Sequence, residues 1–217
     1  GQAVAADLAK AGSRAVFVPG DLERVEDCRR IIPRCDEEFG RLDGLVNAAA
    51  NTNRGTLDNT SVEFWDKIMA TNVRAPFILI QEAARVMKRE NRGGSIVNIL
   101  SMVSYGGQTH LMPYSVSKGA LATLTKNTAV GLRPDRIRIN GLNIGWTATP
   151  AENVIQRGEG QPENWLELAD AKMPFGRLSR PSDIAGITGY LLSDAAEIMT
   201  GSLVDFDQYV MGHLPGW

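Results

Sequence analysis

The feature that most constrains the fold is a regular alternation of strand-like and helix-like segments. Short apolar runs such as 95–100 have the form of buried strands, whereas longer segments such as 114–131 carry a helical pattern. The predicted strands are 14–19, 44–48, 95–100, 136–142 and 202–206, and the predicted helices are 2–11, 24–39, 62–88, 114–131 and 181–193. Alternation at these lengths predicts an α/β fold, with parallel strands joined by right-handed helical crossovers.

Helix-start signals support several of these boundaries. Thr60-Ser-Val-Glu63 has the form of a capping box, which predicts a helix directly after it. Pro181 followed by Asp183 suits a first helical turn, where a carboxylate meets the positive end of the helix. The segment at about 150–180 holds several prolines and glycines and is too long for a simple connection, so we expect a substrate lid there.

Composition sets broad limits. The 217 residues, of which 43% are hydrophobic, suffice for one sizeable domain, and we expect residues 1–217 to form it. A formal net charge of −2 favours neither nucleic acid nor an anionic membrane surface as a partner. We find no apolar run of the roughly 18 residues that a transmembrane helix needs, and no leader, although residues missing from the N-terminus could contain one. We therefore expect a cytoplasmic protein.

The two cysteines, Cys28 and Cys35, lie on one face of the predicted helix 24–39. Their separation along that helix is about 10 Å, at about 1.5 Å per residue, which is too far for a disulfide. We therefore expect reduced thiols in the core. With only His110 and His213 as further ligands, the spacing predicts no metal site.

Tyr114 and Lys118 lie four residues apart at the start of a predicted helix, which places both side chains on one helical face. An ammonium group beside a phenol stabilises the phenolate and lowers a pKa that is normally near 10. The pair therefore indicates proton transfer, although a packed ring beside a solvated amine is also common on helices.

Further polar side chains stand at the ends of predicted elements. Ser101 directly follows the strand 95–100, Asn47 ends a short strand, and Asn72 follows a helical stretch. Because open α/β sheets bind ligands outside the carboxyl ends of their strands, Ser101 faces the expected crevice. Each residue also has an ordinary structural explanation, Ser101 as the end of a strand and Asn72 as a helix terminator.

In their order along the chain, these features resemble the short-chain dehydrogenase/reductase family in its classical single-domain form. The resemblance covers nearly the whole chain and implies a Rossmann-like, doubly wound parallel sheet. The matching pieces are Asp21-Leu22, the N-A-A-A segment 47–50, Asn72, Ser101, Y-S-V-S-K at 114–118, Arg138-Ile-Asn140, Ile144-Gly145, Thr149 and Met199-Thr-Gly201.

One part of the family pattern is not found in this sequence. The family begins with a strand, a glycine-rich turn and a helix, and the end of the next strand selects NAD or NADP. This sequence opens instead on the helical pattern 2–11, so we expect the first strand-helix-strand unit to be missing. Either the N-terminus is processed or incomplete, or a shortened gene product has lost the fingerprint. The first explanation is favoured, because loss of a central strand would leave its neighbours unpaired.

The resemblance implies hydride transfer between a nicotinamide cofactor, NAD or NADP, and the carbon of an alcohol or carbonyl substrate. Tyr114 would be the general acid or base, and Ser101 would hydrogen-bond the substrate oxygen. Lys118 would hold the nicotinamide ribose and, together with the positive ring of the oxidised cofactor, lower the pKa of Tyr114. Asn72 would interrupt its helix and anchor a water through which protons reach solvent.

The resemblance also implies the cofactor contacts. The sequence departs from the family pattern where Ala50 replaces a glycine, Ile144 replaces a proline and 205–208 replace the usual V-D-G-G. The residues assigned to the adenine and ribose side are Asp21, Leu22, Asn47, Ala48 and Ala49, and those assigned to the nicotinamide and phosphate side are Ile144, Gly145, Thr147 and Thr149, beside Tyr114 and Lys118.

The expected substrate pocket combines an aromatic wall with hydrogen-bonding groups, which favours a polyol, sugar or hydroxy acid over a steroid or fatty acyl chain. Trp146 also fits a core position, and His110 a surface loop. The residues expected to line the pocket are Ser101, Val103, Gln108, His110 and Trp146, with the lid around Trp165.

Two other functions are compatible with the same scaffold. A catalytically silent dinucleotide-binding regulatory protein can share the fold, although such proteins typically lack the Tyr-Lys pair. Epimerases and dehydratases of sugar nucleotides carry a larger C-terminal domain than the one strand and short tail expected after residue 193.

The family commonly assembles as tetramers through helices that correspond to 62–88 and 114–131, so we expect a homotetramer. The sequence leaves open the substrate, the direction of reaction and the choice between NAD and NADP.

Overall fold

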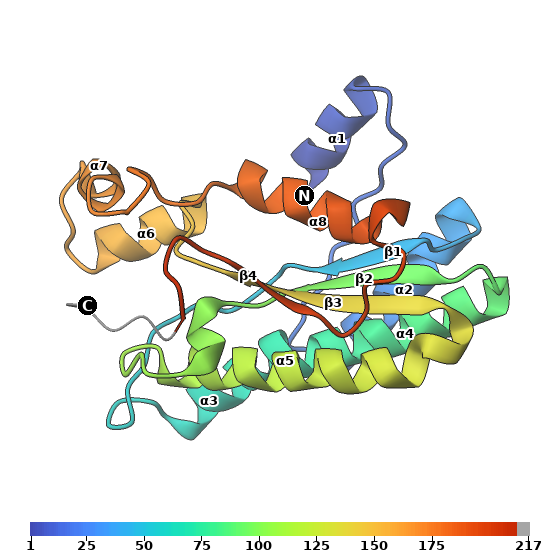
Figure 1. Ribbon diagram of the computed structural model, residues 1–217, viewed down its shortest axis with the longest axis horizontal. Helices are drawn as coiled ribbons and strands as arrows, with labels where there is room; N and C mark the ends of the chain where they lie inside the picture. The colour runs from blue at the N-terminus through green and yellow to red at the C-terminus, as the bar shows by residue number, and fades with distance from the viewer. Residues whose placement is uncertain (212–217) are drawn as a thin grey trace.

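The computed structural model describes residues 1–211, in which a four-stranded parallel sheet carries helices on both faces (Figure 1). Neighbouring strands are hydrogen-bonded in the order β1-β2-β3-β4. The strands are β1 (Gly44–Asn47), β2 (Gly94–Ile99), β3 (Ile137–Ile144) and β4 (Leu203–Phe206). The predicted parallel α/β fold is confirmed. Residues 212–217, which include His213 and end the expected domain 1–217, lie outside the described part.

Helical segments connect each strand to the next. Before β1 lie α1 (Gln2–Lys10) and α2 (Val25–Phe39). The crossover from β1 to β2 contains α3 (Val62–Met69), the π-helical turn η1 (Ala70–Arg74) and α4 (Ala75–Glu90). The crossover from β2 to β3 contains the short turn η2 (Met102–Tyr105), α5 (Met112–Leu132) and η3 (Arg133–Asp135). Between β3 and β4 lie α6 (Pro150–Gly158), α7 (Trp165–Asp170), α8 (Pro181–Leu192) and η4 (Asp194–Ala196).

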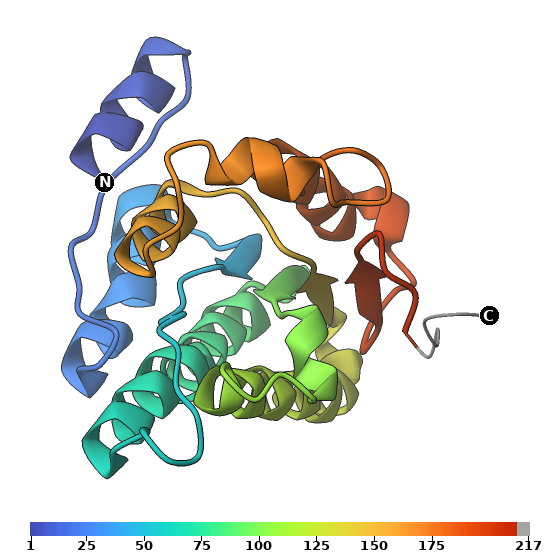
Figure 2. The same ribbon diagram turned by 90° about the vertical axis from the view of Figure 1, so that its left-hand side faces the viewer.

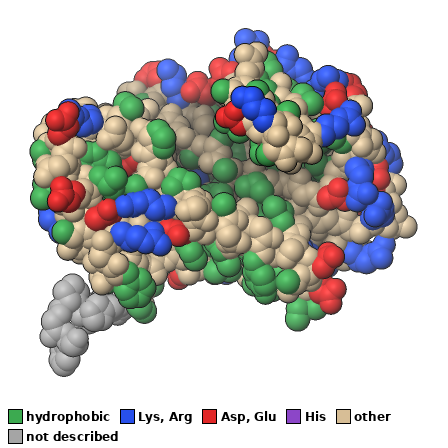
Figure 3. Space-filling model, turned by 90° about the horizontal axis from the view of Figure 1, so that it is seen from above, with side chains coloured by type: hydrophobic (Ala, Val, Ile, Leu, Met, Phe, Trp, Pro, Cys, Tyr) green, Lys and Arg blue, Asp and Glu red, His purple; other side chains and the backbone are tan. Residues whose placement is uncertain are grey.

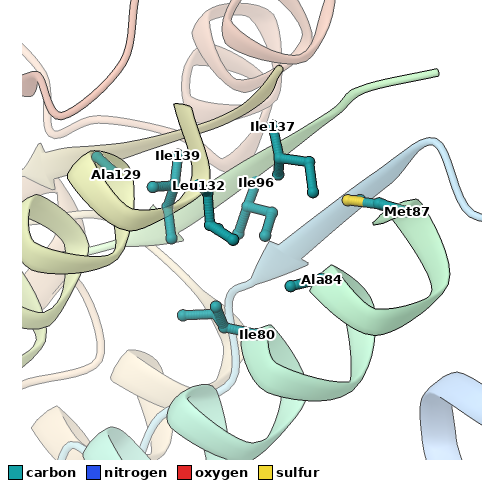
Figure 4. Close-up of a cluster of buried hydrophobic side chains, with 8 residues drawn as sticks. All are labelled: Ile80, Ala84, Met87, Ile96, Ala129, Leu132, Ile137 and Ile139. Atoms are coloured by element: carbon teal, nitrogen blue, oxygen red, sulfur yellow. The ribbon is translucent and has the colours of Figure 1, made fainter. Parts of the chain in front are cut away.

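The sheet forms the middle of three layers. Figure 2 shows α4 and α5 on one face of the sheet and α8 on the other. Below the sheet, Ile96 and Ile139 pack against Met87 of α4 and Leu132 of α5 (Figure 4). Because successive side chains of a strand point to opposite faces, the next residue after Ile96 faces α8 instead. On that side Val97 and Leu142 pack against Leu191. Two apolar cores therefore fix the strands from both sides.

The predicted strand 14–19 is wrong. These residues pair with none of the four strands of the described sheet, and Val16 and Phe17 remain exposed. A strand is stabilised by a hydrogen-bonded neighbour, and an apolar run alone does not supply one. The segment therefore connects α1 to α2 without belonging to the sheet.

The predicted helix 62–88 is interrupted where the sequence places Asn72. The chain forms α3, then the π-helical turn at 70–74, then α4. The predicted capping residue is wrong by one position, because Ser61, not Thr60, accepts the hydrogen bond from the Phe64 N–H at 3.2 Å. Thr60 instead donates its hydroxyl hydrogen to the carbonyl of Thr56.

The segment at 150–180 folds into α6 and α7 beyond the end of the sheet (Figure 1). Thr149 caps α6 by accepting a hydrogen bond from the Glu152 N–H, and Pro150 occupies the first helical turn. Trp165 packs with Met173 and Leu178 in a small core of its own. The expected lid region is therefore an ordered helical layer.

Both cysteines are free thiols. Cys28 is buried under α4, whereas Cys35 is half-buried. Burial raises the pKa of both thiols, so both stay protonated at neutral pH.

Within residues 1–211, no helix has the length and apolar character needed to cross a membrane. Acidic and basic side chains are intermixed on the face seen from above (Figure 3).

Replacement of Ile139 by alanine tests the core between the sheet and α5. Ile139 is 0% exposed, so the Ile139→Ala variant should lose about 2–5 kcal/mol of unfolding free energy. Ile198 is 91% exposed, and the matched Ile198→Ala variant should stay within about 0.5 kcal/mol of the wild type. Urea denaturation measures both changes, and equal losses in the two variants would contradict this packing.

Candidate active site

A cleft of about 850 Å³ opens at the carboxyl ends of the strands. Segments that follow β1, β2 and β3 form its walls, together with the first turns of α5 and α6. This is the edge at which parallel sheets bind their ligands. Ser101, Tyr114 and Lys118 all line this one cleft, so the structure brings together three of the four predicted catalytic residues.

Tyr114 and Lys118 share a face of α5, as their spacing predicts. The Lys118 Nζ atom lies 5.6 Å from the centre of the Tyr114 ring. Lys118 is buried, and its Nζ donates a hydrogen bond to the Ile99 carbonyl at 2.7 Å. The ammonium group is therefore held under the end of β2, between the helix and the sheet.

Lys118 alone does not lower the pKa of Tyr114 in this structure. Burial raises the pKa of Tyr114 to about 12, and the nearby Ser101 side chain opposes that rise. Burial also lowers the pKa of Lys118 to about 8, because a buried ammonium has lost its hydration. Desolvation is therefore the main cause of both pKa shifts.

Ser101 begins the turn η2 after β2. It is buried, and its hydroxyl oxygen accepts a hydrogen bond from the Val103 N–H at 3.4 Å. The other end of η2 is fixed by Tyr105, whose hydroxyl donates to Asp205 at 2.8 Å. Asn143 of β3 donates to the same carboxylate oxygen at 2.7 Å. Asp205, which departs from the family pattern, therefore braces the turn that carries Ser101.

Asn72 lies in the π-helical turn η1 and is buried. Its amide nitrogen donates to the Asn51 carbonyl and to the Ser117 hydroxyl oxygen, each at 2.9 Å. Its amide oxygen accepts from the Asn51 N–H at 2.7 Å. Ser117 in turn donates to the carbonyl of Tyr114 at 2.7 Å. Asn72 therefore does not line the cleft but ties the helix of Tyr114 to the loop after β1.

The predicted cofactor residues divide between two cavities. Those on the nicotinamide side, Ile144, Gly145, Thr147 and Thr149, line the large cleft. Leu22, Asn47, Ala48 and Ala49 line a cavity of about 50 Å³ beside it, and Ala48 borders both. A continuous strip of predicted contacts therefore runs along the carboxyl edge of the sheet, from β1 to β3.

Asn47 carries a polar atom that the fold leaves available. Its side chain is buried and its Nδ2 donates to Asn98 at 2.8 Å. The Nδ2 atom of Asn98 in turn donates a hydrogen bond to the Thr125 hydroxyl oxygen at 2.8 Å. The Oδ1 atom of Asn47 has no hydrogen-bond partner within residues 1–211. A buried acceptor at this position fits a ribose or adenine hydrogen-bond donor of a dinucleotide.

The local contacts of Asp21 and Gly145 explain why these residue types occupy the two positions. Asp21 lines neither cavity, and its carboxylate accepts a hydrogen bond from the Glu23 N–H at 2.9 Å. Gly145 lies against the Asp207 side chain. A Cβ atom added to this glycine would be only 2.1 Å from the Asp207 Oδ1 atom. A side chain at position 145 would therefore displace Asp207 from the wall of the cleft.

The residues predicted to bind substrate reach the cleft. Val103, Gln108, His110 and Trp146 all line it, and the two polar residues among them are exposed. The lid around Trp165 reaches the cleft as expected, whereas Trp165 itself is buried within the lid and stacks on Trp146 with ring centres 6.1 Å apart. The lid residues that do line the cleft include Lys172 and Met173.

Sequence reasoning missed a polar cluster on the far wall of the cleft. Glu152 of α6 accepts hydrogen bonds on one oxygen from Trp146 at 2.8 Å, Gln156 at 2.7 Å and Arg54 at 3.1 Å. Arg54 also forms an ion pair with Glu159. The sequence Thr149-Pro-Ala-Glu152 is a helix-start signal that could have revealed α6 and its first carboxylate.

The residue Gln208 links the lid to the end of the sheet. Its Oε1 accepts a hydrogen bond from the Phe175 N–H at 2.7 Å, and its Nε2 donates to the Arg177 carbonyl at 2.6 Å. Both partners belong to the connection between α7 and α8. Gln208 is one of the four residues that replace the family's V-D-G-G, and here it fastens the lid next to the cleft.

The parallel sheet, the ligand cleft at its carboxyl edge and the buried Tyr-Lys pair define a dinucleotide-dependent α/β oxidoreductase. Residues 1–208 match the family model described as enoyl-(acyl carrier protein) reductase. A solved short-chain type dehydrogenase/reductase from Mycobacterium marinum superposes with a TM-score of 0.85 at 31% identity, covering 95% of this chain and 80% of that chain.

Curated relatives agree. The chain is 30% identical over 196 residues to the 2-dehydro-3-deoxy-D-gluconate 5-dehydrogenase of Escherichia coli, covering 90% of this chain and 76% of the relative. It is 38% identical over 177 residues to the 3alpha-hydroxysteroid dehydrogenase of Mediterraneibacter gnavus, covering 82% of this chain and 68% of the relative. The chain therefore belongs to the short-chain dehydrogenase/reductase family. It is an oxidoreductase that uses NAD or NADP and acts on an alcohol or carbonyl group.

Burial of Lys118 predicts a pH dependence of stability. Between the folded pKa of about 8 and the ordinary value of 10.5, the unfolded chain holds a proton that the folded protein has released. The free energy of unfolding should therefore gain about 3 kcal/mol from this group as pH rises through that window. A Lys118→Met variant should lack the gain, whereas Lys126→Met, at an exposed position of α5, should follow the wild type. Urea denaturation at several pH values measures this, and parallel curves for wild type and Lys118→Met would contradict the burial.

Proposed function

We propose that Tyr114, Lys118, Ser101 and Asn72 carry the reaction, and that the substrate is a polyol, sugar or hydroxy acid. The observation that carries the proposal is the convergence of Ser101, Tyr114 and Lys118 on one cleft beside a strip of predicted cofactor contacts. The polar side chains Gln108, His110 and Arg54 in the same cleft support a substrate with several hydrogen-bonding groups.

Tyr114 gives its proton to the substrate oxygen in reduction and takes it back in oxidation. Ser101 hydrogen-bonds the same oxygen, and its contact with Tyr114 supports this arrangement. A bound nicotinamide supplies the carbon that accepts or donates the hydride. Lys118 brings a positive charge beside the phenol, where it favours the phenolate once a ligand offsets the cost of burial.

Asn72 acts as a positioning residue. Both hydrogens of its amide are committed, to the Asn51 carbonyl and the Ser117 hydroxyl. A water held by Asn72 would therefore rest on one of its oxygen atoms. The Ser117 bridge to the Tyr114 carbonyl fixes the first turns of α5 against η1, so the phenol keeps a constant place in the cleft.

Residues along the carboxyl edge of the sheet would hold the cofactor. The adenosine side contacts Leu22, Asn47, Ala48 and Ala49, with the free acceptor of Asn47 supporting this assignment. Asp21 directly precedes Leu22 in the chain, and we assign it to the adenine side by the family resemblance. The nicotinamide side contacts the residues that line the large cleft: Ile144, Gly145, Thr147, Thr149, Tyr114 and Lys118.

The protein works in the cytoplasm as a homotetramer of single-domain chains. Exposed apolar residues on the two long crossover helices support assembly through α4 and α5, namely Phe77, Val116 and Val130. Such residues are costly in water and are stabilised when a second copy covers them.

Light scattering tests the assembly. The protein should have four times the mass of its chain, as the proposed homotetramer requires. A Val130→Glu substitution should lower the mass, because a carboxylate in an apolar contact loses its hydration. A matched Val154→Glu substitution on the exposed side of α6 should leave the mass unchanged. A monomer for the wild type would contradict the assembly.

Removal of the Tyr114 hydroxyl tests the chemistry. The Tyr114→Phe variant should lower kcat by about 100-fold or more, because the proton donor and acceptor is lost. It should still bind NADH or NADPH, measured by cofactor fluorescence. Tyr190 lies exposed on α8, and Tyr190→Phe is the control that should keep full turnover. Unchanged turnover in Tyr114→Phe would remove this residue from the mechanism.

A further inference from the structure

We propose that Glu152 determines substrate specificity: its carboxylate binds a second hydroxyl group of the substrate, so that the enzyme selects uncharged, polyhydroxylated alcohols. This inference rests on the proposed function and names the class of substrate for the same cleft.

The carboxylate of Glu152 is held in place before any ligand arrives. One oxygen, Oε1, accepts all three hydrogen bonds from Trp146, Gln156 and Arg54. The side chain is only 14% exposed. Its backbone N–H is capped by Thr149 at the start of α6. A carboxylate oriented by three donors needs no rearrangement to bind, which favours specificity.

The second oxygen of Glu152 is the free one. Within residues 1–211 the Oε2 atom makes none of the observed hydrogen bonds, whereas Oε1 makes three. The residue lines the cleft that also contains Tyr114. A carboxylate oxygen accepts only, so its partner must be a donor such as a hydroxyl group.

Glu152 is close enough to Tyr114 to act on it electrostatically. Burial is the main cause of the raised Tyr114 pKa, and the negative charge of Glu152 raises that pKa further. A hydroxyl bound to Glu152 would therefore belong to the same small molecule whose reacting oxygen meets Tyr114.

The charges around the cleft favour an uncharged substrate. Arg54 lies between two carboxylates, those of Glu152 and Glu159, so its charge is already compensated. Three cationic and three anionic side chains line the cleft and balance each other, which gives neither an acid nor an amine a net attraction. They are Arg54, Lys118 and Lys172, and Glu152, Glu159 and Asp207.

Family membership leaves the substrate class open. One relative is named for a sugar acid and another for a hydroxysteroid, so the two differ in polarity and size. The cleft of this chain has its own polar wall, which narrows the hydroxy compounds of the first proposal to neutral polyols. An apolar ring would leave the free oxygen of Glu152 buried without a donor, which is costly.

Matched substrates and variants test the inference. The probes are the vicinal diol of cyclohexane against cyclohexanol, and the vicinal diol of butane against secondary butanol. With the full-length protein and NAD or NADP, kcat/KM should favour each diol over its mono-alcohol by at least about tenfold. The Glu152→Gln variant should lower that ratio by at least about tenfold, because the amide loses the charged acceptor. The control Glu163→Gln, which removes an exposed carboxylate that does not line the cleft, should keep the ratio.

A second variant separates charge from hydrogen bonding. Glu152→Asp keeps the negative charge but withdraws the oxygen by one methylene group, so the diol preference should fall while the pH profile stays. Glu152→Gln should also shift the pH profile of kcat/KM toward lower pH, because the negative charge that raises the Tyr114 pKa is gone. Thermal unfolding checks that both variants remain folded. If only one of them folds, its ratio of kcat/KM for diol over mono-alcohol still tests the proposal.

The outcomes separate the two proposals. Equal turnover of diols and mono-alcohols by the wild type, or an unchanged ratio in a folded Glu152 variant, would overturn the role of Glu152 while leaving Tyr114 as the catalytic acid and base. Full activity in Tyr114→Phe would instead overturn the proposed mechanism.

Discussion

The burial of Lys118 beneath the carboxyl end of β2 is the interaction on which the site depends. Its ammonium group donates to the Ile99 carbonyl and lies beside the Tyr114 ring. This contact joins the helix that carries the phenol to the strand that precedes Ser101. Both cores of the sheet stabilise that strand, because Ile96 faces α4 and α5 while Val97 faces α8. Packing far from the cleft thus determines where the reactive groups lie.

Burial and charge act on the pair in opposite directions. Removing water raises the pKa of Tyr114 to about 12 and lowers that of Lys118 to about 8, so burial disfavours the charged form of each group, although Lys118 stays mainly an ammonium at neutral pH. An added positive charge in the cleft reverses this balance for the phenol. The ring of an oxidised nicotinamide would bring such a charge, so the proposed mechanism predicts that proton transfer by Tyr114 depends on cofactor binding.

Much of the fold and part of the site follow from local sequence patterns. Each buried strand from 94 to 144 has the apolar run that predicts it, and residues that follow such strands meet at one edge, as Ser101 shows. The strand predicted at 14–19 failed because pairing is a property of the neighbours and not of the segment. The pair of Arg54 and Glu152 could not be predicted, since 98 residues separate them and only tertiary folding brings them into contact. The direction of the Tyr114 pKa shift likewise depends on burial, which spacing does not reveal.

The most direct test of this account is an absorbance titration of the Tyr114 phenol, taken as the difference between wild type and Tyr114→Phe. For the protein alone, the account predicts that Tyr114 ionises near 12, above the ordinary range of tyrosine. Saturation with the oxidised cofactor should lower that pKa by at least about one unit, because a positive charge then faces the phenolate. A pKa near 10 that is the same with and without cofactor would contradict both the burial and the coupling.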